Sequence, residues 1–163
     1  MDDAGERQDG LRDAFEEAFA RLRAQIESAC ASEDGWAGGV AAGVRAALAL
    51  AGEEPGAARA LTTDALAGGK PGFARYERLI AYLRDLLARG REEAPEARAL
   101  PAETERALVG GIAMLVAQRL DTGRESELPG LAAEAAQFVL TPYLGVSEAR
   151  RVARQTLSRR SHR

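Results

Sequence analysis

The chain has 163 residues and a formal net charge of −3; 46% of its residues are hydrophobic and 29% are charged. This length suits one domain with a buried core, and the composition excludes a disordered chain and any general attraction for nucleic acid or anionic lipid. Alanine (35 residues) and leucine (19) dominate, against seven valines and three isoleucines. Helix formers therefore greatly outnumber the β-branched residues that strands favour, and we expect an all-α protein.

Glycines, prolines and apolar periodicity predict a single-domain bundle of about six helices. Each predicted helix repeats its apolar residues every three to four positions. The first helix does so at Leu11, Phe15, Phe19, Leu22 and Ile26. In chain order, the predicted helices span residues 9–31, 36–51, 55–67, 71–89, 102–121 and 129–144. Gly123 and Gly145 are expected to cap the last two.

The two ends of the chain differ from this bundle. We expect residues 1–10 to be a disordered acidic N-terminus. They lack the apolar core of a signal peptide, so none is predicted. We expect residues 146–163 to form a polar helix and a basic tail, whose arginines are solvated. No apolar run approaches the roughly 20 residues of a membrane span. The single cysteine, Cys30, excludes an internal disulfide and suits a reducing compartment, so we expect a cytoplasmic protein with no membrane partner.

Residues suited to catalysis are scarce. His162, the only histidine, is the second-to-last residue, so Cys30 has no neighbouring base in the sequence and the commonest transition-metal ligand is missing. The carboxylates alternate with arginines on polar helix faces, and no Glu-x-x-His pair is present to build a di-metal site. The segment Gly68–Gly72 lacks the Ser/Thr of a phosphate-binding loop. We expect no enzyme, no catalytic residue, no metal site and no cofactor.

Large rings and small residues occur together in two of the predicted long helices. The rings are Trp36, Phe73, Tyr76 and Tyr82. The small residues beside them are Gly39, Ala42 and Gly43. Such residues can pack together as an ordinary core, or they can line a cavity between helices, where bundles hold small molecules. The spacing alone leaves both interpretations open.

The order of the segments is more specific. A long amphipathic helix is followed by "GWAGGVAAGVRAALALAGEEPGAARAL", "KPGFARYERLIAYLRDLLARG", "LVGGIAMLVAQRL" and "LPGLAAEAAQFVLTPYLG". Over residues 11–145 this order resembles the C-terminal regulatory domain of TetR-type (tetracycline-repressor-like) bacterial transcriptional regulators. The resemblance implies an effector-sensing and homodimerisation domain that binds a small apolar or aromatic ligand. The alternative is a helical-bundle interaction protein that binds neither ligand nor DNA.

The resemblance also assigns roles to residues. It implies an effector pocket lined by Trp36, Val40, Phe73, Tyr76, Ile80 and Met114. It implies that the last two long helices form a four-helix bundle with those of a second copy, through Leu108, Gly111, Ile112, Leu115, Phe138 and Thr141. Family members carry a helix-turn-helix before the long first helix. Only ten residues precede Leu11 here, so we expect DNA contact only through a unit that is missing from this chain.

Two adjacent glycines, Gly110 and Gly111, interrupt an otherwise apolar helix. Each costs on the order of 1 kcal/mol relative to alanine. Their missing side chains would let another backbone approach closely, either that of a second copy or that of a helix in the same subunit. Both explanations remain open at this point. Pro142 falls near the end of the last long helix, where it is expected to bend or end it.

Overall fold

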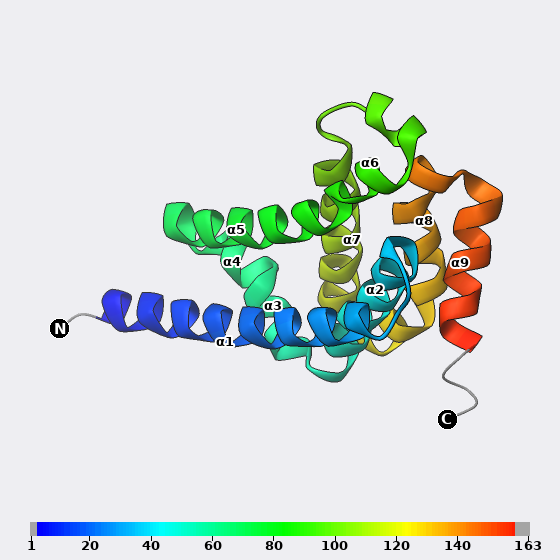
Figure 1. The fold of residues 1–163 in the computed structure, drawn as a ribbon. Coiled ribbons are helices and arrows are strands. Elements are labelled where there is room, and N and C mark those ends of the chain that lie inside the picture. Colours follow the sequence, from blue (N-terminus) through cyan, green and yellow to red (C-terminus); the bar gives the residue numbers. More distant parts are fainter. Residues whose placement is uncertain (1–2, 159–163) are drawn as a thin grey trace.

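The computed structural model describes residues 3–158, and within them it contains helices but no strand (Figure 1). The predicted all-α fold class is therefore confirmed. In chain order the helices are α1 (Asp3–Ala31), α2 (Trp36–Glu53), α3 (Pro55–Leu61), α4 (Thr63–Ala67), α5 (Gly69–Ala88), α6 (Gly90–Glu93), the 3₁₀ helix η1 (Pro95–Ala99), α7 (Thr104–Asp121), the 3₁₀ helix η2 (Glu125–Leu131), α8 (Ala132–Leu144) and α9 (Val146–Ser158). Across these residues, none of the helices combines the length and apolarity needed to cross a membrane.

The N-terminal segment is the first correction to the sequence prediction. Residues 3–10, expected to be disordered, form the first turns of α1. An ion pair between Arg12 and Asp9, 3.0 Å apart, supports this part of the helix, and the Gln8 side chain donates a hydrogen bond to the backbone oxygen of Gly68. Local charge pairing and one contact to the α4–α5 turn therefore extend the helix beyond its apolar stripe.

The other helix boundaries agree with those predicted from the glycines and prolines, with two differences. The predicted helix 55–67 is divided at Thr62, whose hydroxyl donates to the Ala58 oxygen at 2.7 Å and whose backbone leaves helical geometry. The predicted helix 129–144 begins with the 3₁₀ turn η2 and becomes α-helical at Ala132. Gly123 and Gly145 have φ values of +67° and +76°, as expected of glycines that follow helix ends.

Helix α9 packs on the bundle instead of leaving it as a separate polar segment. Its apolar face is buried at Ala149 and Ala153, which are 0% and 2% exposed. The Arg45 side chain of α2 donates to the backbone oxygen of Thr156 at 3.0 Å. The helical part of the expected 146–163 segment thus belongs to the same packed unit as residues 11–145. The remaining part of the predicted basic tail, residues 159–163, lies outside the described residues.

Helix α2 lies at the centre of the core. Its residues contribute to all three groups of buried side chains: Val40 and Ala41 pack toward α5, α7 and α8, Leu50 toward α1 and α3, and Leu48 toward α7 and η2. In Figure 1, α1 and α5 run across the view with α3 and α4 between them, and α7, α8 and α9 stand across their right-hand ends. Side chains from α1, α2, α5 and α7 line a cavity.

Candidate ligand pocket

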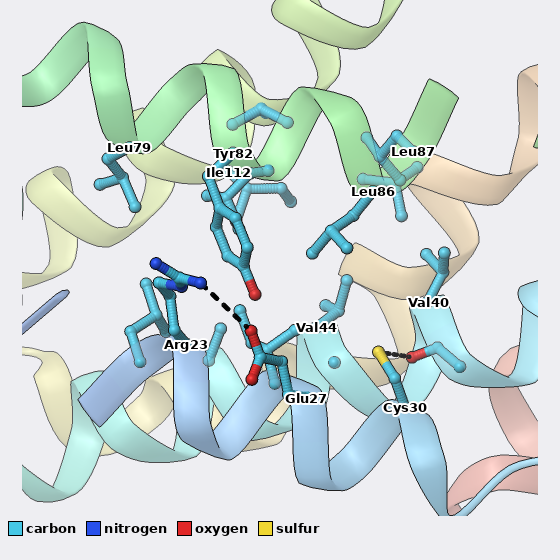
Figure 2. Close-up of a pocket in the computed structure, with 18 of the residues that line it drawn as sticks. Arg23, Glu27, Cys30, Val40, Val44, Leu79, Tyr82, Leu86, Leu87 and Ile112 are labelled. Carbon is cyan, nitrogen blue, oxygen red and sulfur yellow. Dashed lines mark hydrogen bonds and ion pairs between the residues drawn. The ribbon is translucent and has the colours of Figure 1, made fainter. Parts of the chain in front are cut away.

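A cavity of about 930 Å³ occupies the space between these helices. Most of its lining is aliphatic, and Figure 2 shows Val40, Val44, Leu79, Leu86, Leu87 and Ile112 around it. Pockets that hold small molecules usually measure roughly 300–1,000 Å³ and are mainly apolar, with a few polar groups. The cavity has the size and the lining of such a site.

The cavity stays open because the residues that face it from α2 and α7 are short. Ala47 and Ala51 on α2 and Ala113 on α7 reach only a little way toward α1 and α5. Helices α1 and α2 also approach closely, since a Cβ built on Gly43 would lie 3.4 Å from Cγ2 of Ile26. The alanine content of the chain thus produces empty space where larger side chains would have produced a filled core.

Trp36, at the first position of α2, forms one end of the cavity. Its indole Nε1 donates a hydrogen bond to the backbone oxygen of Leu86 at 3.0 Å, and its ring meets that of Tyr143 edge-on at 4.9 Å between centroids. The indole fits there only because residue 90 is glycine: a Cβ on Gly90 would lie 2.4 Å from the indole ring. These contacts join α2 to α5, α6 and α8 and hold the indole in one position.

A polar group of three residues lies at the opening of the cavity: Arg23 and Glu27 from α1 and Tyr82 from α5 (Figure 2). The guanidinium of Arg23 lies 3.6 Å from the Glu27 carboxylate and 5.2 Å from the centre of the Tyr82 ring. Arg23 and Glu27 are 52% and 60% exposed, so their mutual attraction is weak. Both therefore remain available for other contacts at the cavity mouth.

The hydroxyl of Tyr82 is the unusual member of this group. It points from α5 toward Glu27 (Figure 2), it is buried, and it has no hydrogen-bond partner among the described residues. Burial raises the pKa of Tyr82 and the nearby Glu27 charge adds to the effect, whereas the Arg23 guanidinium opposes it, so the hydroxyl keeps its proton at neutral pH. A buried hydroxyl without a partner costs about 1–3 kcal/mol. A ligand that reached this corner could remove that cost.

Cys30 also lines the cavity, at the end near Trp36. Its thiol donates to the backbone oxygen of Gly39 at 3.3 Å. Burial raises the pKa of the Cys30 thiol, which keeps it in the less reactive protonated form. Its environment is that of a packing residue.

The pocket residues implied by the resemblance divide into two sets. Trp36, Val40 and Ile80 line the cavity. Tyr76 packs between two parts of the core and is not among the lining residues, and the side chains of Phe73 and Met114 are 52% and 67% exposed outside the cavity. Phe73 lies in the first turns of α5, far along the helix from the cavity end. Met114 is on the face of α7 opposite to Val109, Ala113 and Val116, which do line it.

The sequence did not identify Arg23 or Glu27 as pocket residues. The sequence spacing could have indicated these two residues. Arg23 and Glu27 lie next to the apolar stripe of α1 near Ile26, on the same helix face as Cys30. Tyr82 was recognised only as one of several rings. Its importance depends on the distance between α1 and α5, which no local pattern encodes.

The residues assigned to the dimer face are also divided. Leu108 is buried in the core at 7% exposure, and Ile112 lines the cavity. The outward part of this set consists of Gly111, Leu115, Phe138 and Thr141. Together with the exposed Met114, which the resemblance had placed in the pocket, we call these residues the α7–α8 surface. Phe138 is 49% exposed, and its ring lies 3.3 Å from a Cβ built on Gly111. Two large apolar side chains, Met114 and Phe138, are therefore exposed on this surface.

Gly110 tests one explanation of the glycine pair. A Cβ built at this position would meet none of the described atoms within 4 Å. Close packing inside the subunit therefore does not explain this glycine, contrary to one of the two sequence-based explanations. At Gly111, the nearest neighbour is a side chain, the ring of Phe138, and not a backbone.

A buried ion pair fixes the beginning of α7. Glu105 is 3% exposed; its carboxylate accepts hydrogen bonds from Nε and Nη2 of Arg91 at 2.7 and 2.9 Å and from the Tyr143 hydroxyl at 2.9 Å. Arg91 also donates to the backbone oxygens of Leu100 and Pro101, both at 2.8 Å. Chiefly through the Arg91 hydrogen bonds, the pKa of Glu105 is held below its ordinary value of 4.5. The network joins α6, the connector after it, α7 and α8.

Comparisons with known proteins add no assignment: no family model, no curated protein and no solved structure matches this chain. Residues 3–158 also contain no group of three or more His, Cys, Asp or Glu side chains that could hold a metal ion. The resemblance to TetR-type regulators thus stays a prediction, and the case for function depends on the geometry of the cavity.

Proposed function

We propose that this chain is the effector-sensing and dimerisation domain of a TetR-type transcriptional regulator. The cavity between α1, α2, α5 and α7 is the observation that carries the proposal: about 930 Å³ of mostly apolar space, with one end formed by Trp36. A stable core does not keep such a space without cost, because interiors are normally packed as densely as organic crystals. A ligand that fills it gains about 0.8 kcal/mol for each CH₂ group that it buries.

The pocket is tested with N-phenylnaphthylamine, a neutral apolar probe whose fluorescence rises when it leaves water. Val44→Phe places a ring in the cavity and should weaken probe binding about tenfold or more while the helix content stays unchanged. Ala24→Phe adds the same ring on an exposed face of α1 and should leave binding unchanged. If the wild type does not bind the probe, or if both variants bind it equally well, the cavity is not a ligand site.

Pairing with a second copy is the other part of the proposal. The α7–α8 surface supports it, because Met114 and Phe138 expose large apolar side chains that self-association would cover. Sedimentation should give a particle of twice 17.3 kDa. Met114→Glu should shift the particle toward a monomer, whereas Leu66→Glu, at another exposed apolar residue, should not. A monomeric wild type would refute this part and favour the alternative of an interaction protein with a different partner.

A further inference from the structure

We infer that the cavity selects, among small apolar molecules, those that carry one protonated amine, and that Glu27 and Tyr82 hold this amine at the cavity opening. The inference rests on the proposed ligand-binding function and adds the chemical class of the ligand. It depends on three features, which are the unpartnered Tyr82 hydroxyl at the opening, the net charge of the residues that line the whole cavity, and the position of Arg23.

The first feature is the hydrogen-bonding capacity left at Tyr82 and Glu27. The Tyr82 oxygen is buried without a partner and faces the Glu27 carboxylate across the opening (Figure 2). The Arg23–Glu27 separation of 3.6 Å exceeds hydrogen-bond length, so Arg23 leaves that carboxylate able to accept further bonds. An ammonium group has three donors and no acceptor, and one such group can donate to both oxygens at once.

The second feature is the balance of charge around the cavity. Its lining includes four carboxylates, those of Glu27, Glu33, Glu92 and Glu93, against the two guanidiniums of Arg23 and Arg89, which gives a net charge of −2. A cleft lined by an excess of one sign concentrates ligands of the opposite sign. A carboxylate ligand would be repelled, and a neutral alcohol would gain nothing from these charges.

The third feature shows that this corner accommodates a cation. The guanidinium of Arg23 already lies over the Tyr82 ring, 5.2 Å from its centre. Aromatic faces attract positive charge. An amine bound between Tyr82 and Glu27 would meet the same ring and the same carboxylate, while its apolar body would extend between Val44 and Ile112.

Three probes with one body and different head groups test the inference: adamantylmethylamine, adamantylmethanol and adamantanecarboxylic acid. Trp36 is the only tryptophan and lines the cavity, so its fluorescence reports occupancy by these non-absorbing compounds. The amine should bind about tenfold more tightly than the alcohol, and the acid should bind most weakly. Added salt should reduce the preference for the amine, because the charges at the opening are exposed.

Single substitutions identify the residues that produce the preference for the amine over the alcohol. Glu27→Gln should bring the amine close to the alcohol in affinity, and Tyr82→Phe should weaken both while leaving the acid unchanged. Glu17→Gln, on the same helix but 73% exposed and outside the cavity, is the matched control and should keep the wild-type preference. Because Glu27 is 60% exposed, Glu27→Gln should fold normally even if Tyr82→Phe does not.

The outcomes separate this inference from the proposed function. If the alcohol or the acid binds as tightly as the amine, the amine assignment is wrong while the pocket remains. If Glu17→Gln loses the preference as Glu27→Gln does, the effect comes from overall charge and the assignment is again wrong. If none of the three compounds binds and N-phenylnaphthylamine does not bind either, both proposals fail.

Discussion

Glu105→Gln removes the charge from a nearly buried carboxylate and keeps its size. Glutamine retains one acceptor, but its NH₂ group replaces an oxygen that accepts from Arg91. Removing one partner of a buried pair costs about 3–5 kcal/mol. Arg91 is 24% exposed and keeps two backbone acceptors, so the expected loss is smaller, about 2–3 kcal/mol. For a chain of this length, that loss lowers the melting temperature by about 5–10 °C.

The effect of Glu105→Gln depends on pH. Because the folded pKa of Glu105 lies below its ordinary value of 4.5, the ionised carboxylate stabilises the fold above that value. The contribution decreases as the pH falls from the ordinary value through the lower folded value. The difference in unfolding free energy between wild type and variant should therefore be largest at neutral pH and shrink in acid.

Urea unfolding followed by circular dichroism, at neutral and at acid pH, measures both predictions. Glu127→Gln is the matched control, because Glu127 is an exposed carboxylate paired with Arg124 at 2.8 Å and should cost less than about 1 kcal/mol. Equal losses of unfolding free energy in the two variants would show that the desolvation of Glu105 cancels its attraction to Arg91. The reasoning from the buried pair would then be refuted.

Three further changes test the packing. Gly90→Ala places a Cβ 2.4 Å from the Trp36 ring, so it should lower the unfolding free energy by about 1–3 kcal/mol and shift the tryptophan emission. Leu140→Ala, at a residue that is 0% exposed, should cost about 2–5 kcal/mol in chemical denaturation, whereas Leu66→Ala, at 45% exposure, should cost under about 1 kcal/mol. Because burial raises the pKa of Cys30, its thiol should be alkylated more slowly in the folded protein than in urea, and equal rates would contradict its burial.

The helices were predictable because their signals are local. Of the predicted apolar stripe, Phe15, Phe19, Leu22 and Ile26 are buried, and only its first member, Leu11, is partly exposed. The glycines after α7 and α8 also end helices as expected. The start of α1 was missed because charge pairs, and not apolar residues, extend it to Asp3. The division at Thr62 depends on a side-chain hydrogen bond that competes with the helix.

The pocket was harder to predict than the helices. Periodicity shows which residues share a face, but it does not show which neighbour that face meets. Ile112 and Met114 are two positions apart on one apolar helix; the first lines the cavity and the second is exposed. The Tyr82 ring packs against Phe19 of α1 at 5.7 Å between centroids, yet its hydroxyl meets no hydrogen-bonding partner within the described part of the chain. Where that hydroxyl ends relative to the facing helix depends on the complete packing of the chain.

The indole of Trp36 belongs both to the cavity wall and to the packing of α8. Its ring meets Tyr143, and the Tyr143 hydroxyl holds Glu105 at the start of α7. A molecule that displaces the indole therefore changes the contacts of both helices that bear the α7–α8 surface. Occupancy of the cavity and the packing of these helices then share a coupling free energy, which is reciprocal by thermodynamic linkage. On the proposed function, a ligand that displaces the indole and a contact that fixes α7 against α8 would each change the affinity of the other by the same factor.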